Sequence, residues 1–289
     1  MAYNLGGKVL SYRMLMSAPL NIHPTAIVHE RAKIAPGCHI GPYCIIGPNV
    51  VLHGGVRLDS HVVIERNTNV GENSHICSFS VLGGDPQHVA YSGQETHLII
   101  GKNAQIREHV TIHRGTMEGG GSTTVGDRVF LMVGVHIAHD CRVGDDVVMA
   151  NQATLGGHVD IGSHAVLGGL CAIHQFTRIG EGAMIAGFSG VNTDVIPYGM
   201  VLGYRAKLKG INRVKLRRLH ATHEEIRAIY AAFQWIFQRT GGSFSQRIDT
   251  LPQEILAFPR AQRLQEFLKY DFRRSICMME AVSDLESPL

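Results

Sequence analysis

A short segment, V-H-I-A-H-D-C at residues 135–141, brings together side chains that can move protons. A neutral histidine is a suitable general base near physiological pH. An adjacent aspartate can hold the ring in one tautomer and stabilise the imidazolium once it forms. His139 followed by Asp140 therefore predicts a base with its orienting partner, and His136 lies three residues earlier.

This segment belongs to a repeat of six residues. An aliphatic side chain recurs in frame over residues 22–82, 100–112 and 125–191. An amphipathic helix would space its apolar residues by three and four, and a plain strand would space them by two. The six-residue period instead indicates a solenoid in which each hexad is one short strand and one turn. The glycine that often follows the aliphatic residue, as at Gly41 and Gly47, is expected to permit the corner.

The pattern resembles the hexapeptide repeat of left-handed β-helices, in which three hexads complete one coil. Residues 18 apart are then vertical neighbours, separated by about 4.8 Å. Three columns are expected at one corner: Ala138, Gly156 and His174; His139, Gly157 and Gln175; and Asp140, His158 and Phe176.

These columns predict a particular chemistry. Gly157, stacked on His139, offers a backbone N–H where a side chain would block approach, as an oxyanion hole requires. The columns contain no serine or cysteine, so a covalent acyl-enzyme is not expected. Direct attack of an activated acceptor on a thioester is the simpler mechanism.

Other interpretations of the histidines stay open. The chain has 17 histidines, so some of them cluster as plain solvated residues. The spacing His136-x-x-His139 is also compatible with zinc. Trimeric β-helices resembling the gamma carbonic anhydrases hold zinc between subunits, so a zinc-dependent hydratase is one alternative. A β-helix that only binds or scaffolds is another, but the intact residues His139, Asp140 and Gly157 argue against it.

Composition limits the partners. Only 18% of the 289 residues are charged and the net charge is +3, too mild to predict nucleic-acid binding by the whole chain. No apolar run reaches the ~20 residues of a membrane span. No secretion signal is recognised at the start, so a cytoplasmic protein is expected. The six cysteines lack C-x-x-C spacing and are expected to be reduced thiols.

The breaks in the repeat set the expected organisation, which is mainly β. Residues 1–21 form an N-terminal extension, residues 22–202 a left-handed parallel β-helix, and residues 203–289 a small C-terminal α-helical domain. The frame is interrupted at 83–98 and 114–124. These segments are expected to be loops that project from the coil, and loops on a rigid scaffold often carry binding residues.

Three helices are expected to cap the open end of the solenoid. The first starts at Thr222, with Glu225 as partner in a capping box, and ends at Gly241 or Gly242. The others cover residues 252–258 and about 259–270, the last beginning with a proline.

Five motifs then resemble one family, the UDP-N-acetylglucosamine acyltransferases of lipid A biosynthesis. They follow in the same order and with similar spacing: T-I-H-R-G-T at 111–116, G-G-G at 119–121, H-I-A-H-D-C at 136–141, G-G-H-V at 156–159 and H-Q-F at 174–176. The likeness covers about residues 22–240. It implies a homotrimer with active sites between subunits, a 3-hydroxyacyl group on acyl carrier protein as donor, and neither a metal nor a cofactor.

The resemblance also implies roles for individual residues. His139 is the base on the sugar 3-position, Asp140 its partner, and the N–H of Gly157 stabilises the tetrahedral intermediate. The sugar nucleotide and the pantetheine arm are bound by Gln87, His88, His136, His158, His174, Gln175, Asn212 and Arg218. Acyl-chain length depends on Gly187, near Met184 and above Gly169, and small residues at these levels suggest a long chain unless they merely turn corners.

The chain departs from the family at the acceptor side. The first loop of the family usually reads Q-D-L-K-Y, whereas this chain has Gln87-His88-Val89-Ala90-Tyr91, and Val214 replaces an expected glutamate. Losing charged partners alters specificity. An acceptor with a 3-amino group, giving an amide, is therefore an alternative to the 3-hydroxyl sugar.

A basic run precedes the expected helices. Seven lysines and arginines lie between Arg205 and Arg218. Such a run is often only a solvated face, but carrier proteins are strongly acidic, and a basic patch steers an acidic partner. Docking of the carrier protein is the better interpretation, and Arg218 is expected to pair with nucleotide phosphate.

Overall fold

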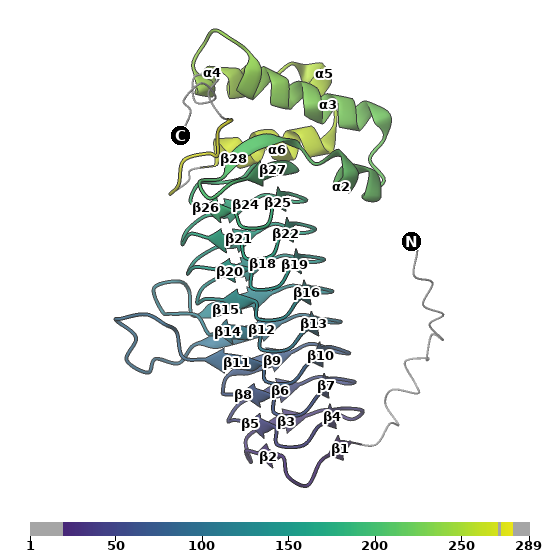
Figure 1. Cartoon of the computed structure of the whole chain (residues 1–289), viewed down its shortest axis with the longest axis vertical. Coiled ribbons are helices and arrows are strands. Elements are labelled where there is room, and N and C mark those ends of the chain that lie inside the picture. Colours follow the sequence, from purple (N-terminus) through teal and green to yellow (C-terminus); the bar gives the residue numbers. More distant parts are fainter. Residues whose placement is uncertain (1–19, 271–272, 280–289) are drawn as a thin grey trace.

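The computed structural model describes residues 20–270 and 273–279, so nearly all of the predicted N-terminal extension lies outside the described residues. Short strands stack into a tall column, and helices cover its C-terminal end (Figure 1). Three sheets form the walls of the column. Successive strands belong to successive sheets, so a strand generally pairs with the strand three positions later in the chain. The aliphatic residue of each hexad points into this prism: Ile40, Leu58 and Ile76 are fully buried.

The first wall, sheet A, consists of parallel strands apart from its final antiparallel pair. Its members are β1 (Asn21–Ile22), β4 (His39–Ile40), β7 (Arg57–Leu58), β10 (His75–Ile76), β13 (Gln105–Ile106), β16 (Phe130–Leu131), β19 (Val148–Met149), β22 (Val166–Leu167), β25 (Met184–Ile185), β27 (Gly199–Leu202) and β28 (Lys207–Ile211).

The other two walls are wholly parallel. Sheet B contains β2 (Ile27–Val28), β5 (Ile45–Ile46), β8 (Val63–Ile64), β11 (Val81–Gly84), β14 (Thr111–His113), β17 (His136–Ile137), β20 (Thr154–Leu155), β23 (Ala172–Ile173) and β26 (Gly190–Val191). Sheet C contains β3 (Lys33–Ile34), β6 (Val51–Leu52), β9 (Thr68–Val70), β12 (His97–Ile100), β15 (Ser122–Val125), β18 (Arg142–Val143), β21 (Asp160–Ile161) and β24 (Arg178–Ile179).

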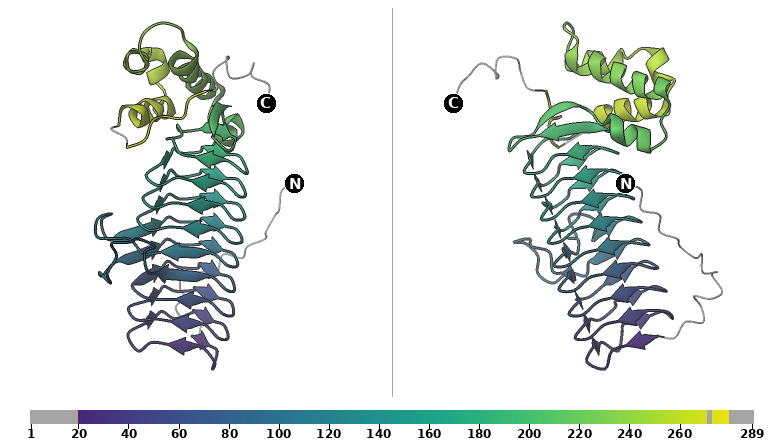
Figure 2. Two further views of the ribbon diagram at one scale, coloured as in Figure 1. Left: turned by 60° about the vertical axis from the view of Figure 1, so that its left-hand side comes forward. Right: turned by 45° about the vertical axis from the view of Figure 1, so that its right-hand side comes forward.

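The two breaks in the repeat lie at the same corner of the prism. One loop connects β11 to β12 and the other connects β14 to β15, so both pass from sheet B to sheet C. They project from the same side of the column (Figure 2). The turn between β17 and β18, which contains His139 and Asp140, lies at this corner one coil later. The interruptions therefore place two loops beside the predicted catalytic residues.

The corners are built differently from the sequence prediction. The positive φ at the corners is adopted by glycines such as Gly55, at 74°, and also by other residues such as Asp140, at 62°, and His158, at 60°. Gly47 has no positive φ, but a Cβ there would lie 1.5 Å from the carbonyl oxygen of Glu65. The glycine directly after the aliphatic residue is thus needed because the next coil approaches closely, and the prediction that it permits the corner was wrong.

The C-terminal region has more helices than the three expected. They are α2 (Arg213–Arg218), α3 (His223–Phe233), a π-helical turn (Gln234–Gln238), α4 (Phe244–Asp249), α5 (Gln253–Leu256) and α6 (Pro259–Lys269). The predicted starts after Thr222 and at Pro259 are confirmed. Helices α2 and α4 were missed, since six residues give little periodic signal.

The predicted capping box of α3 is half formed. The Thr222 hydroxyl accepts the N–H of Glu225, as expected. The Glu225 carboxylate does not return to the cap, because it pairs with Arg260 of α6 at 2.5 Å. This ion pair joins α3 to α6, the last helix of the region. The six cysteines are all free and buried, as the reduced thiols predicted from the sequence would be.

Candidate active site

The predicted base and its partner are in direct contact. Nδ1 of His139 lies 2.7 Å from Oδ2 of Asp140, and both side chains are almost fully buried. A carboxylate can only accept at this distance, so Nδ1 carries the proton and Nε2 of the neutral ring is left as an acceptor. The arrangement leaves Nε2 free to receive a proton from a substrate.

Asp140 is held in place by the second loop. Its Oδ1 accepts the backbone N–H of Thr116 at 2.7 Å, and its Oδ2 accepts the Thr116 hydroxyl at 2.7 Å. The backbone N–H of Asp140 donates to the Thr123 hydroxyl at 2.8 Å. Burial raises the pKa of Asp140, but the hydrogen bonds from His139 and Thr116 outweigh it and lower that pKa below its ordinary value. The carboxylate is therefore charged and fixed in orientation.

Gly157 lies against the ring of His139, as the column predicted. A Cβ on Gly157 would lie 2.6 Å from Cε1 and 2.8 Å from Nε2 of that ring. Among the described residues, the amide of Gly157 donates no hydrogen bond. A bare N–H beside the basic nitrogen is the donor that a developing oxyanion needs.

Further histidines surround the pair. The rings of His158 and His88 lie with their centroids 5.2 Å from that of His139, each edge-on. His136 contacts the Thr111 hydroxyl at 2.8 Å and lies edge-on to His113. Burial lowers the pKa of His158, and burial together with His113 lowers the pKa of His136 to about 4. Both rings are thus neutral hydrogen-bonding groups at physiological pH.

His174 and Gln175 reach the same corner and meet a segment that the sequence did not link to them. Arg274, 100 residues later, donates from Nη2 to Nδ1 of His174 at 2.8 Å and from Nε to the Gln175 carbonyl at 3.1 Å. The same Nδ1 lies 3.2 Å from the Gln175 carbonyl oxygen, so Arg274 contacts both the ring and the backbone at this corner.

A buried arginine anchors the first loop, which connects β11 to β12. Arg114 is fully buried and its guanidinium bonds to the Gly83 carbonyl, to Asp85 and, at 3.0 Å, to the Tyr91 hydroxyl. This holds the loop so that His88 meets the ring of His139. Gln87, predicted to bind substrate, is exposed on the same loop.

Other predicted residues lie elsewhere within one chain. Met184 is in β25 of sheet A, and Gly187 and Gly169 lie at the corner that leads from sheet A to sheet B. The two glycines stack: a Cβ on Gly187 would lie 3.2 Å from the Gly169 carbonyl oxygen. The catalytic pair is at a different corner. A single chain therefore does not bring the acyl-length residues to His139.

Asn212 and Arg218 also stand apart from the catalytic corner. Asn212 is buried as the N-cap of α2, where its amide donates to the Gly182 carbonyl and accepts the N–H of Lys215. Arg218 is the exposed last residue of the same helix. The side chain of Asn212 is thus already occupied within the chain, and the substrate contacts predicted for both residues stay predictions.

The ligand atoms of His139, Asp140 and His158 are close enough to one another to hold a metal. Both oxygens of Asp140 and Nδ1 of His139 already have short hydrogen bonds, so a metal would have to displace them. A pocket of about 380 Å³ adjoins Asp140 and His158 on the side of sheet C. The geometry favours a base and its partner over a metal centre.

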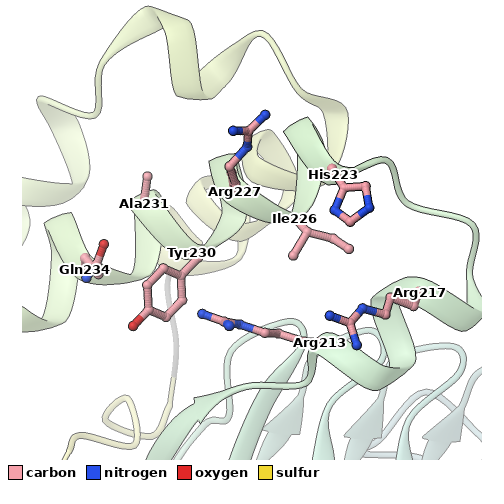
Figure 3. Close-up of a pocket in the computed structure, with 8 residues that line it drawn as sticks. All are labelled: Arg213, Arg217, His223, Ile226, Arg227, Tyr230, Ala231 and Gln234. Carbon is pink, nitrogen blue, oxygen red and sulfur yellow. The ribbon is translucent and has the colours of Figure 1, made fainter.

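A second pocket, of about 390 Å³, lies between α2 and α3. Arg213 extends beneath Tyr230, with its guanidinium carbon 4.5 Å from the ring centroid, and Arg217 and His223 flank the other end (Figure 3). The predicted basic run thus contributes two of its arginines to one concave surface. In the described residues, no helix combines the length and apolar character that crossing a membrane requires.

A parallel β-helix with a general-base corner is typical of the hexapeptide-repeat acyltransferases. Residues 122–157 match the bacterial transferase hexapeptide model, and residues 22–118 match the GMPPB C-terminal domain model. Residues 194–277 match the model described as UDP-N-acetylglucosamine O-acyltransferase, domain 2.

Relatives over nearly the whole chain then define the family. An acyl-[acyl-carrier-protein]–UDP-N-acetylglucosamine O-acyltransferase of Caulobacter vibrioides is 47% identical, over 90% of this chain and 99% of its own. The solved structure of LpxA from Acinetobacter baumannii has a TM-score of 0.85 and 42% identity, covering 89% and 99% of the two chains. That of the Francisella novicida UDP-N-acetylglucosamine acyltransferase has a TM-score of 0.86 and 35% identity, covering 91% and 95%.

The chain belongs to the acyl-[acyl-carrier-protein]–UDP-N-acetylglucosamine O-acyltransferase family. This confirms the predicted fold class, a left-handed parallel β-helix with a small C-terminal helical part. The sequence prediction missed Thr116, Arg114 and Arg274. The first two stand in the quoted T-I-H-R-G-T motif, whereas no local signal marks Arg274.

Proposed function

We propose that the protein transfers a 3-hydroxyacyl group from acyl carrier protein to the 3-position of UDP-N-acetylglucosamine, the first step of lipid A biosynthesis. Relatives named as acyl-[acyl-carrier-protein]–UDP-N-acetylglucosamine O-acyltransferases match about nine-tenths of the chain. The observation that carries the proposal is the bare amide of Gly157 beside Nε2 of His139, whose Nδ1 is bonded to Asp140.

The residues support a mechanism without a covalent enzyme intermediate. The sugar 3-hydroxyl oxygen attacks the thioester carbonyl carbon while Nε2 of His139 takes the hydroxyl proton. The N–H of Gly157 stabilises the resulting oxyanion, and Asp140 stabilises the imidazolium. The intermediate then expels the pantetheine sulfur, which receives the proton from His139. The products are the 3-O-acyl sugar nucleotide and the carrier protein with a free thiol. Neither a metal nor a cofactor takes part in these steps.

A homotrimer with sites between chains accounts for the separation of the site residues. Met184, Gly187 and Arg218 lie away from the catalytic corner of their own chain, as residues that serve the corner of a neighbour would. Mixing His139→Ala chains with Arg218→Ala chains tests this. Activity restored by refolding the two together supports shared sites, and mixtures that stay inactive contradict them.

The donor side depends on the basic surface of the C-terminal region. Arg213, Arg217 and His223 line one pocket there, and an acidic carrier protein complements such a surface. The absence of side chains at Gly169 and Gly187, at the corner after sheet A, fits a long acyl chain. The cytoplasmic location stays a prediction and follows from the nature of the two substrates.

A 3-amino acceptor is a second candidate, favoured by the first loop. The loop places His88 against His139, where the family has an acidic residue, and it has Ala90 in place of the lysine. His88 and Ala90 do not supply the acidic and lysine side chains that contact the usual acceptor. Turnover with 3-hydroxyacyl carrier proteins of several lengths, offered both acceptors in parallel, tests the proposal. A preference for the 3-hydroxyl sugar rejects the amide alternative, and no product with either acceptor rejects acyl transfer.

A further inference from the structure

A second cluster of metal-binding side chains lies at the corner after sheet A, away from the catalytic corner. Asp59 directly follows β7, and His75 and Cys77 flank the inward-facing Ile76 of β10. The two strands pair with Ile76 opposite Leu58, so Cys77 stands one coil above Asp59. One ligand atom from each of Asp59, His75 and Cys77 lies within 4.8 Å of the others.

Among the described residues, the ligand atoms of this cluster contact mainly one another, and Nε of Arg57 lies 3.5 Å from Oδ1 of Asp59. Nε2 of His75 is buried and 3.0 Å from Oδ1 of Asp59, yet among the described residues it has no hydrogen bond of acceptable geometry. The thiol of Cys77 is 6% exposed and interacts with the Asp59 carboxylate. By contrast, four other cysteine thiols donate to backbone carbonyls: Cys38, Cys44, Cys141 and Cys277.

We propose that Asp59, His75 and Cys77 bind a zinc ion that clamps two successive coils of the solenoid. Thiolate, imidazole and carboxylate are the ligands that zinc takes in proteins. Zinc–ligand bonds of about 2.0–2.3 Å give ligand separations of roughly 3.5 Å, so small side-chain rotations close the site. A thiolate and a carboxylate carry two negative charges, which balance the dication, and water completes the tetrahedron.

The cluster also admits a simpler interpretation, an Asp59–His75 ion pair with Cys77 as a bystander. The ion pair needs no metal, and its formation does not depend on the Cys77 thiol. The positions 59, 75 and 77 belong to no short zinc motif, because the 18-residue coil brings them together. The choice between a zinc clamp and an ion pair is therefore made by metal binding to matched variants.

The test is zinc titration of the full chain, stripped with a chelator, against a competing chromophoric chelator. Cys77→Ser and Asp59→Asn each remove one ligand, and Cys38→Ser is the control because serine can still donate to the His53 carbonyl that Cys38 contacts. We expect one zinc per chain, weakened more than about tenfold in both ligand variants and unchanged in the control. Cobalt(II) is expected to give a thiolate charge-transfer band that Cys77→Ser abolishes.

Equal zinc affinity in wild type, Cys77→Ser and Asp59→Asn would overturn the clamp, as would no zinc bound to the wild type. Thermal unfolding with and without zinc adds a second readout, since only a clamp raises the Tm of the wild type more than that of Cys77→Ser. If Cys77→Ser does not fold, Asp59→Asn still decides the matter. The titration contains no substrate, so its outcome does not depend on the proposed acyl transfer.

Discussion

Thr116→Val removes one hydrogen bond from the catalytic carboxylate and leaves another in place. The lost donor is the hydroxyl that lies 2.7 Å from Oδ2 of Asp140, whereas the backbone N–H of residue 116 still reaches Oδ1. A hydrogen bond to a charged group contributes about 1.5–3 kcal/mol. If the whole of this free energy is lost from transition-state stabilisation because His139 is no longer held in position, turnover falls by roughly 10- to 150-fold.

The same change has a pH-dependent effect on stability. The pKa of Asp140 is lowered in the folded protein, so its contribution is present above the unfolded pKa and is lost as the pH falls through the folded pKa. Removing the hydroxyl raises the folded pKa toward its ordinary value. The variant is therefore destabilised at pH 7, and the difference from wild type shrinks in acid.

The assay measures kcat and KM at pH 7, together with thermal unfolding from pH 7 down to pH 3. Thr116→Ser keeps the hydroxyl and is expected to retain most of the activity. A Thr116→Val enzyme with the kcat of Thr116→Ser would refute the positioning role. A stability loss that is the same at all pH values would show that packing, and not the hydrogen bond to Asp140, explains the effect.

Three further results are expected. Gly157→Ala places a Cβ within 2.6 Å of the His139 ring and displaces the base, so kcat should fall by about 10²-fold or more in a folded protein; near-normal turnover would show that the position of the His139 ring does not depend on Gly157. Arg274→Ala removes the contacts that hold the His174 ring and the Gln175 carbonyl, so KM for one substrate should rise more than kcat falls, with partial rescue by Arg274→Lys; kinetics equal to those of the wild type would contradict it. Burial and His113 lower the pKa of His136 to about 4, so protonation favours the unfolded chain, and stability should decline as the pH falls from about 6.5 to 4. His136→Gln should flatten that part of the Tm profile, and an unchanged slope would exclude His136 as the cause.

The six-residue period made much of the site predictable. Because residues 18 apart pair directly, the columns that join His139 to Gly157 and Asp140 to His158 could be drawn from the sequence. The six-residue period does not extend into the loops. The contact between Thr116 and the Asp140 carboxylate therefore had no sequence signal beyond the motif that contains Thr116. Arg274 meets His174 only because the last described segment returns to the solenoid, where Ile276 bridges to Asp194.

Packing between coils, and not the local geometry of the corner, determines where the repeat requires glycine. The glycine after the aliphatic residue was expected to permit the corner, yet the positive φ of the corner falls at other positions, including Asp140, His158 and Phe176. Glycine is required instead where the backbone of the next coil leaves no room for a Cβ, as at Gly47. That requirement depends on the separation of stacked coils, which a single hexad does not reveal.

The central claim is that His139 activates the acceptor for direct attack on the carrier-bound thioester. The most direct test compares wild-type protein and His139→Ala in turnover with a 3-hydroxyacyl carrier protein and UDP-N-acetylglucosamine, following the acylated sugar nucleotide by mass. The account predicts product from the wild type and a loss of about 10²- to 10⁴-fold in the folded variant, with no acylated protein in either. Undiminished turnover in His139→Ala, or an acyl group covalently attached to the protein, would contradict it.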